Sequence, residues 1–115
     1  MDPNCIFCKI VAKVNSSQTI YKDDRVTAFL DIHPVAPLHI LIVPNKHIAS
    51  VNAVEPEDEP VLGHLFTVAH QIASQEGIDQ TGYRMIINTG PNAGQAIYHL
   101  HLHLLGGRRM SFPMG

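Results

Sequence analysis

The stretch Tyr98–Leu105 has the sequence YHLHLHLL, in which histidine and leucine alternate strictly. A period of two predicts a half-buried β-strand, because successive side chains of a strand point to opposite faces. The leucines then face a core, and the imidazoles lie about 7 Å apart along the other face. Imidazole can be a nucleophile, a proton donor or a metal ligand near pH 7, so three in register favour a functional site over a solvated surface. The two sets are Leu100, Leu102 and Leu104, and His99, His101 and His103.

Length and composition limit the class of protein. With 115 residues we expect one domain, 1–115, whose residues 108–115 form a tail. The net charge of −2 predicts neither nucleic acid nor a membrane surface as a partner. No apolar stretch approaches the ~20 residues that span a bilayer, and residues 1–4 do not resemble a signal peptide. We therefore expect a cytoplasmic protein with reduced thiols, and its small core favours a homo-oligomer.

Hydrophobic periodicity around the histidine stretch predicts an α+β domain of about five strands, mostly antiparallel, with one long and one short helix. The long helix runs from about Val61 to Gly77, and its histidines His64 and His70 are expected to be solvated. Asn4 is the expected cap of the short helix. The continuous hydrophobicity of 39–43 favours a central strand covered on both faces. Further strands are expected over 19–21, 25–31, 83–88 and 98–105.

The loop Thr89–Gln95 precedes the histidine stretch and contains two glycines. Gly94 permits a backbone conformation that a Cβ would block, and successive amides in such a loop can point at an anion. Gln95 adds a neutral donor. Amides and imidazoles together at this position suit a phosphate or phosphoryl group.

At this point the chain resembles a known family. The alternating histidines are similar to those of the histidine triad (HIT) superfamily of nucleotidyl hydrolases and transferases. The flanking segments 83–88, Gly94-Gln95 and 106–108 resemble its Hint branch of adenosine phosphoramidases, and DIHPVAPLH at 31–39 resembles the first active-site segment. The resemblance implies the HIT fold, a homodimer, and hydrolysis of P–N bonds in purine nucleoside 5′-monophosphoramidates through a covalent nucleotidyl-histidine.

The resemblance also implies roles for single residues. His101 matches the nucleophile, His103 the donor to the phosphoryl oxygens, and His39 an upstream histidine that supports the nucleophile's site. Asp31 matches the carboxylate that binds the ribose hydroxyls, although an Asx turn is an equally good reading of the sequence alone. Asn88, Gly94 and Gln95 match the phosphate and leaving-group side, where Ala96 replaces a serine of some Hint members. An apolar purine clamp, which spacing alone would assign to the core, comprises Ile6, Phe7, Ile10, Phe29 and Ile32.

A metal site is the second implication. Cys5 and Cys8 form a C-x-x-C pair, and several bacterial HIT proteins and the related galactose-1-phosphate uridylyltransferases look alike here. The resemblance implies a structural zinc ion held by Cys5, Cys8, His47 and His99, a closed set with no open position for hydrolysis. A metal-free pair of buried thiols is the alternative.

Three other functions compete with the phosphoramidase. A dinucleoside polyphosphate hydrolase of the Fhit type is one, although the ending Gly106-Gly107-Arg108 and the short chain favour Hint. A nucleotide-binding interaction module with little turnover is another. The third is a three-histidine metallohydrolase, because alternate residues of a strand can chelate catalytic zinc.

Overall fold

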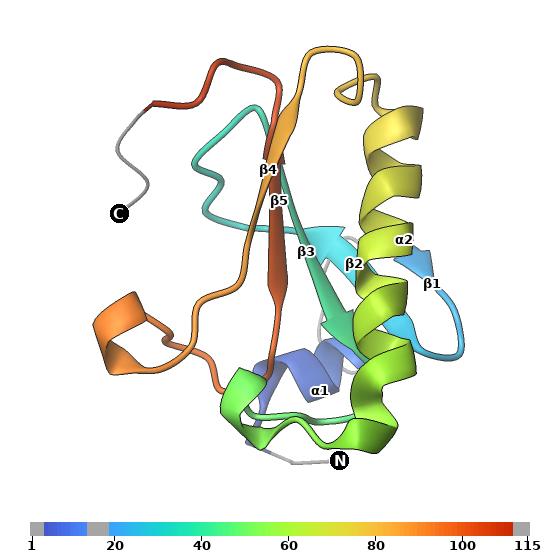
Figure 1. Ribbon diagram of the computed structural model, residues 1–115, viewed down its shortest axis with the longest axis vertical. Coiled ribbons are helices and arrows are strands. Elements are labelled where there is room, and N and C mark those ends of the chain that lie inside the picture. Colours follow the sequence, from blue (N-terminus) through green and yellow to red (C-terminus); the bar gives the residue numbers. More distant parts are fainter. Residues whose placement is uncertain (1–3, 14–18, 112–115) are drawn as a thin grey trace.

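The computed structural model describes residues 4–13 and 19–111, so part of the predicted tail lies outside the described residues. Within them the chain forms one antiparallel sheet of order β1-β2-β3-β5-β4, with one long and one short helix (Figure 1). This is the predicted α+β architecture. None of these helices is long and apolar enough to cross a membrane. The elements are α1 (Ile6–Val11), β1 (Thr19–Lys22), β2 (Val26–Leu30), β3 (Leu38–Pro44), α2 (Glu59–Gln75), β4 (Tyr83–Ile86) and β5 (Leu102–Gly106), with single 3-10 turns at Val51–Ala53, Pro56–Asp58 and Pro91–Ala93.

β3 lies in the middle of the sheet, as its continuous hydrophobicity predicts. Leu41 is paired with Phe29 of β2 on one side and with His103 of β5 on the other. Six of its seven residues are buried. A strand with neighbours on both edges and cover on both faces has no solvent-facing positions, so the alternation of polar residues disappears.

One face of the sheet, here called the α2 face, is closed by the long helix (Figure 1). Ile40 and Ile42 of β3 point to it, and Leu65 and Val68 of α2 pack against them in one buried cluster. The predicted leucines of the histidine stretch belong to the same cluster and are at most 1% exposed. This part of the prediction is confirmed, because the side chains at alternate positions reach the same core. Those leucines are Leu100, Leu102 and Leu104.

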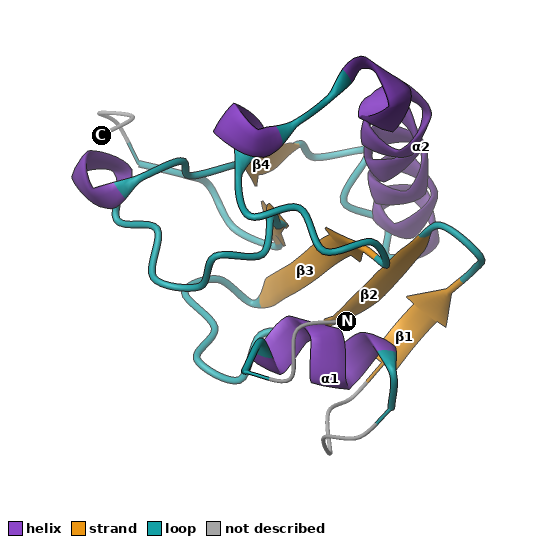
Figure 2. Cartoon of the chain, turned by 90° about the horizontal axis from the view of Figure 1, so that it is seen from below, coloured by secondary structure: helices purple, strands orange, loops and turns teal. Residues whose placement is uncertain are grey.

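The opposite face, here called the α1 face, is partly covered by the short helix (Figure 2). A second buried cluster joins α1 to Phe29, Leu41 and Val43, whose side chains alternate with those of the α2 face. His39 and His103 lie on strand positions of the same parity as Leu41 and Leu105. The imidazoles of the sheet therefore share the α1 face.

The histidine stretch differs from the prediction at its start. β5 begins at Leu102, so the expected strand over 98–105 is too long by four residues, and His99 is not part of a strand. The amide of Leu100 donates to the carbonyl of Ile48 at 2.7 Å, which ties this segment to a loop instead of to β3. The His99 ring is fully buried.

Two smaller expectations were also wrong. The cap of α1 is Cys5, whose Sγ accepts a hydrogen bond from the Cys8 amide at 3.3 Å, and not Asn4. His64 is not simply solvated, because its Nε2 lies 2.6 Å from Oδ2 of Asp23 and connects α2 to the turn between β1 and β2. His70 is exposed, as expected.

Candidate active site and metal cluster

Two histidines of the α1 face form a hydrogen-bonded line whose proton positions follow from their partners. The amide of Val35 donates to Nδ1 of His39 at 3.1 Å, so the proton of the neutral His39 ring is on Nε2. That Nε2 lies 2.9 Å from Nδ1 of His103 and 3.3 Å from Oδ2 of Asp31. His103 therefore accepts at Nδ1, and its neutral ring carries its own proton on Nε2, where it can be donated to a ligand.

Burial keeps both of these rings neutral. Desolvation lowers the pKa of His39, although the carboxylate of Asp31 acts in the opposite direction. Burial, together with the nearby rings of His101 and His39, lowers the pKa of His103 to about 4. At neutral pH the line therefore contains uncharged donors and acceptors.

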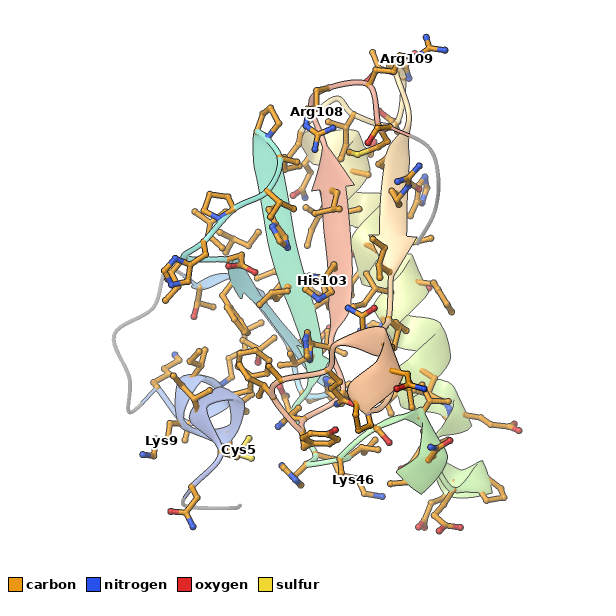
Figure 3. All side chains as sticks on the ribbon, turned by 90° about the vertical axis from the view of Figure 1, so that its left-hand side faces the viewer. Cys5, Lys9, Lys46, His103, Arg108 and Arg109 are labelled. Carbon is orange, nitrogen blue, oxygen red and sulfur yellow. The ribbon has the colours of Figure 1, made fainter. Side chains whose placement is uncertain are left out.

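His101 has the opposite tautomer. Its Nδ1 lies 2.8 Å from the carbonyl oxygen of His99, an acceptor only, so Nδ1 carries the proton and donates. Nε2 then keeps its lone pair, and the half-buried ring is available for attack on an electrophile. The His103 ring lies edge-on with its centroid 5.0 Å away (Figure 3 labels His103 on the exposed side of the sheet). A nucleophilic nitrogen and an N–H donor thus lie side by side.

His99 points into a different site. Its Nε2 donates to the carbonyl of Pro44 at 2.8 Å, which leaves Nδ1 unprotonated. This Nδ1 lies 3.3 Å from Sγ of Cys5 and 3.5 Å from Sγ of Cys8. His47 completes the group, with Nδ1 3.2 Å from the Cys8 sulfur.

These four side chains could hold a metal ion. Their ligand atoms all lie within 4.8 Å of one another, and both cysteines are free thiols. Two sulfur and two imidazole ligands without a carboxylate suit a tetrahedral closed site of the structural kind. The Cys8 amide and the Pro44 carbonyl bond to the ligands and fix their orientation. The three histidines of the triad, by contrast, do not converge on one point in the part of the chain described, so they do not form a three-histidine metal site.

An apolar cavity of about 210 Å³ opens beside these histidines on the α1 face. All five residues expected in the purine clamp line it, so the structure brings them together. Ile32 is 80% exposed and Ile6 44%, values that fit the rim of an open pocket better than a core. The lining consists of Ile6, Phe7, Ile10, Phe29, Leu30, Asp31, Ile32, His33, Leu41 and Ile97.

Asp31 lies at the polar end of this cavity. Its Oδ1 accepts from the His33 amide at 2.8 Å, which is the Asx turn that the sequence allowed. Its Oδ2 faces His39. The carboxylate is only partly buried, and it retains lone pairs for hydroxyl groups of a ligand in the cavity.

The glycine loop is more self-contained than expected. Gly94 has the left-handed conformation that glycine favours, with φ of 81°, but its amide donates to Pro91 and that of Gln95 donates to Gly90. The side-chain amide of Gln95 donates to the carbonyls of Ala49 and Ile97 at 2.9 and 3.1 Å. These donors hold the loop together and are not directed at an anion.

Two other residues of this segment are more accessible. The half-buried amide of Asn88 makes no hydrogen bond to any of the residues described, so both its donor and its acceptor are available to a ligand. Ala96 is exposed and lines a separate cavity of about 250 Å³ next to Cys5 and His47.

Comparison with known proteins shows the family of this chain. The HIT domain family matches residues 12–110, and the chain belongs to this family. Its sequence is 54% identical over 115 residues to the purine nucleoside phosphoramidase of Escherichia coli strain K12, a span that covers all of this chain and 93% of that protein. It is also 45% identical over 115 residues to an uncharacterized HIT-like protein of Synechococcus elongatus, with full coverage of both chains.

Solved structures show the same fold. A HIT family hydrolase from Legionella pneumophila superposes with a TM-score of 0.95 at 44% identity, covering 97% of this chain and all of that one. A histidine triad protein from Clostridium difficile superposes with a TM-score of 0.96 at 42% identity, covering 98% of this chain and 98% of that one. The five-stranded α+β HIT fold that the resemblance implied is therefore confirmed.

Sequence reasoning missed two contributors to the site. One is the backbone amide of Val35, which sets the tautomer of His39. The proline-rich loop around it was a visible signal, because prolines fix backbone directions in such loops. The other is a contact of Phe7, which was expected in the purine clamp but also packs against His101, with ring centroids 5.1 Å apart. Its position in a short apolar helix gave no indication of this contact.

Proposed function

We propose that this protein hydrolyses the P–N bond of purine nucleoside 5′-monophosphoramidates, with AMP or GMP as the nucleotide product. The hydrogen bond from Nδ1 of His101 to the His99 carbonyl carries the proposal, because it leaves the Nε2 lone pair free on a ring that packs against Phe7, a residue of the apolar cavity. The 54% identity over the whole chain to a protein named purine nucleoside phosphoramidase supports this substrate class.

The reaction has two displacements at phosphorus. In the first, Nε2 of His101 forms a bond to the α-phosphorus, the P–N bond breaks, and the amine leaves with its electron pair and a proton. In the second, water attacks the nucleotidyl-histidine, releases the nucleoside monophosphate and restores the neutral ring. Covalent catalysis divides one difficult displacement into two easier ones. The His99 carbonyl stabilises the positive charge that develops on the ring when Nε2 is bonded to phosphorus.

His103 and His39 serve the phosphoryl group. His103 donates from Nε2 to a phosphoryl oxygen, and His39 holds it in that tautomer through the 2.9 Å hydrogen bond. Ala96 has no hydroxyl, so we assign protonation of the leaving amine to the His103 N–H or to the amine's own proton. Asn88 contributes its unpaired amide to the phosphate side of the pocket, and Gly94 and Gln95 act by shaping the loop.

The nucleoside occupies the apolar cavity. In this proposal its purine lies among the clamp residues Ile6, Phe7, Ile10, Phe29 and Ile32. The ribose hydroxyls donate to Asp31, and hydrogen bonds to a charged carboxylate are stronger than neutral ones. In this proposal the 5′-phosphoryl group points towards His101 and His103. The contact of Asp31 with His39, which is hydrogen-bonded to His103, supports this orientation.

We also propose that the metal of the Cys5, Cys8, His47 and His99 group is zinc. Such an ion supplies crosslinks that hold α1 and His99 in place and takes no part in the chemical steps. The two thiols are expected to stay reduced in the cytoplasm, where we place the protein.

We further propose that the protein is a single domain over 1–115 and acts as a homodimer. Among the described residues, β4 lies at the edge of the sheet and pairs with β5 alone, so its outer hydrogen-bonding groups are open to another strand. Met85 of this edge strand is 41% exposed. Analytical ultracentrifugation should give twice the chain mass, and a mass of one chain at micromolar concentration would contradict the dimer.

The main test is turnover of the tryptamine phosphoramidate of AMP. We expect release of tryptamine and AMP by the wild type, with an AMP adduct detected by mass spectrometry in acid-quenched protein. His101→Gln should lose both, whereas His70→Gln, the same change at an exposed position of α2, should retain both. AMP binding without amine release would show a binding module, and faster hydrolysis of a dinucleoside polyphosphate would show the Fhit-type activity. Turnover by His101→Gln near the wild-type rate would exclude the assigned nucleophile.

A further inference from the structure

The short helix α1 lies between the metal cluster and the nucleotide cavity and contributes to both. Cys5 and Cys8 are one helical turn apart and point to the cluster. Phe7, between them in the sequence, lines the cavity together with Ile6 and Ile10. Six residues are too few for a stable isolated helix, so the position of α1 depends on what its side chains contact.

Those contacts are few and specific. The apolar side packs on Phe29, Leu41 and Val43 of the sheet, and Lys22 donates to the carbonyl of Val11 at the far end of the helix. The sulfur side meets the rings of His47 and His99. A bound metal ion would form bonds of about 2.0–2.3 Å to each of these atoms. The S···N distances of 3.2–3.5 Å are already close to the separation of neighbouring ligands in a tetrahedral site. Ligation would therefore fix the Cys5 end of α1 to the cluster.

Phe7 connects α1 to the nucleophile. Its ring is 5% exposed and meets His101 edge-on, with an interplanar angle of 81° and centroids 5.1 Å apart. Its ring centroid lies 6.0 Å from that of His99 and 5.3 Å from that of Phe29. Edge-on aromatic packing depends on distance and angle, so a shift of α1 changes how the His101 ring is held.

His99 supplies a second connection. Its ring belongs to the metal cluster, and its carbonyl oxygen accepts the Nδ1 proton of His101 at 2.8 Å. A residue that is fixed at its side chain has less freedom to move its backbone carbonyl. The metal cluster is thus connected to His101 in two ways. Phe7 packs against the His101 ring, and the His99 carbonyl accepts its Nδ1 proton.

From this arrangement we infer that Phe7 is a positioning residue that couples the metal cluster to the nucleotide site, so that metal binding and nucleotide binding strengthen each other. The inference rests on the proposed function, since it concerns the same nucleotide cavity. Coupling of this kind is reciprocal: the factor by which metal tightens nucleotide binding equals the factor by which nucleotide tightens metal binding.

Calorimetric titration of AMP into metal-free and Zn²⁺-loaded protein measures the coupling factor. We expect at least about fivefold tighter binding to the loaded wild type, the lower end of ordinary coupling between two sites. Phe7→Leu should bind Zn²⁺ but give a clearly smaller factor, because only the connection through His99 remains. Taking the ratio within each protein cancels any loss of purine contact that is common to the metal-free and loaded forms. Lys9→Ala is the matched control, because Lys9 lies on the outer side of α1 (Figure 3) and should keep the wild-type factor.

A second measurement needs only loaded, folded protein and decides the question if the metal-free chain unfolds. With Co²⁺ in the cluster, AMP should shift the visible absorption bands of the ion in the wild type and in Lys9→Ala, and shift them clearly less in Phe7→Leu. An unchanged wild-type spectrum at saturating AMP, or equal AMP affinity with and without metal, would overturn the coupling while leaving the proposed function intact. Failure of the loaded protein to bind AMP or to cleave the phosphoramidate would instead overturn the proposed function.

Discussion

The two faces of the sheet are built from neighbouring residues of the same strands, yet they differ in almost every property. The α2 face is aliphatic, continuous and sealed by a 17-residue helix. The α1 face carries imidazoles, thiols and a carboxylate, is covered by a six-residue helix, and contains an open cavity. The comparison shows that alternation along a strand lets one segment serve stability with one half of its side chains and chemistry with the other.

The largest expected effect tests this division at His101. Replacement by glutamine removes the nucleophile and should lower kcat for an adenosine phosphoramidate by at least about 1,000-fold, as is usual when the attacking group is lost. The melting temperature should change little, because the ring is only half-buried. Steady-state kinetics and thermal denaturation on the same preparation check both parts. A large loss of stability would mean that His101 of the α1 face also serves to stabilise the fold, contrary to the division between the two faces.

Leu102 is the next residue along the chain, and its replacement should lower stability but leave kcat unchanged. It is fully buried on the α2 face, and Leu102→Ala should destabilise the fold by about 2–5 kcal/mol through lost contacts and a cavity. The folded fraction should keep a wild-type kcat at low temperature. Urea denaturation gives the free energy of unfolding, and active-site titration corrects kcat for the folded fraction. A mutant with normal stability but low kcat would contradict the assignment.

Asp23 tests the connection between α2 and the turn that joins β1 to β2. Its carboxylate accepts from the Tyr21 hydroxyl and His64 at 2.6 Å and from two backbone amides at 2.8 Å. These bonds hold the pKa of Asp23 well below its usual 3.8, although burial acts in the opposite direction. Asp23→Asn should cost about 1–3 kcal/mol near neutral pH.

The stability difference between wild type and Asp23→Asn should depend on pH. A depressed carboxyl pKa gives stability that is present above 3.8 and is lost as the pH falls towards the folded-state value. The difference between wild type and Asp23→Asn should therefore shrink below pH 4 in urea denaturation. A difference that stays constant across this range would show that the carboxylate charge is unimportant.

The last prediction is the pH dependence of stability that His103 adds on the α1 face. Its pKa is lowered to about 4 in the folded state from 6.5, so the unfolded chain binds this proton first as the pH falls. The contribution to stability is complete above 6.5 and is lost between 6.5 and about 4, with a slope of up to about 1.4 kcal/mol per pH unit. His103→Gln should have a flatter stability profile in this window. Equal slopes for the two proteins would indicate that the ring is not desolvated.

Hydrophobic periodicity and the family resemblance predicted different parts of the molecule. Periodicity predicted secondary structure and the core, and the resemblance predicted the residues of the site. Periodicity identified α2, the central position of β3 and the burial of Leu102 and Leu104, because each depends on local spacing. It placed His99 wrongly, since the start of a strand depends on where a partner is available. Spacing could not separate the clamp from the core either, because both are apolar. His64 was misjudged because its partner, Asp23, is 41 residues away.

The sequence alone determined which side chains share a face and which residues carry imidazole, thiol and carboxylate groups, because these follow from chemical identity and a period of two. Only the tertiary structure decided what each histidine does. The partners of three rings come from distant segments or from the backbone: Pro44 and the cysteines for His99, the His99 carbonyl for His101, and Val35 for His39. A neutral imidazole has two nitrogens that differ only in which one holds the proton, and contacts near 3 Å settle that choice.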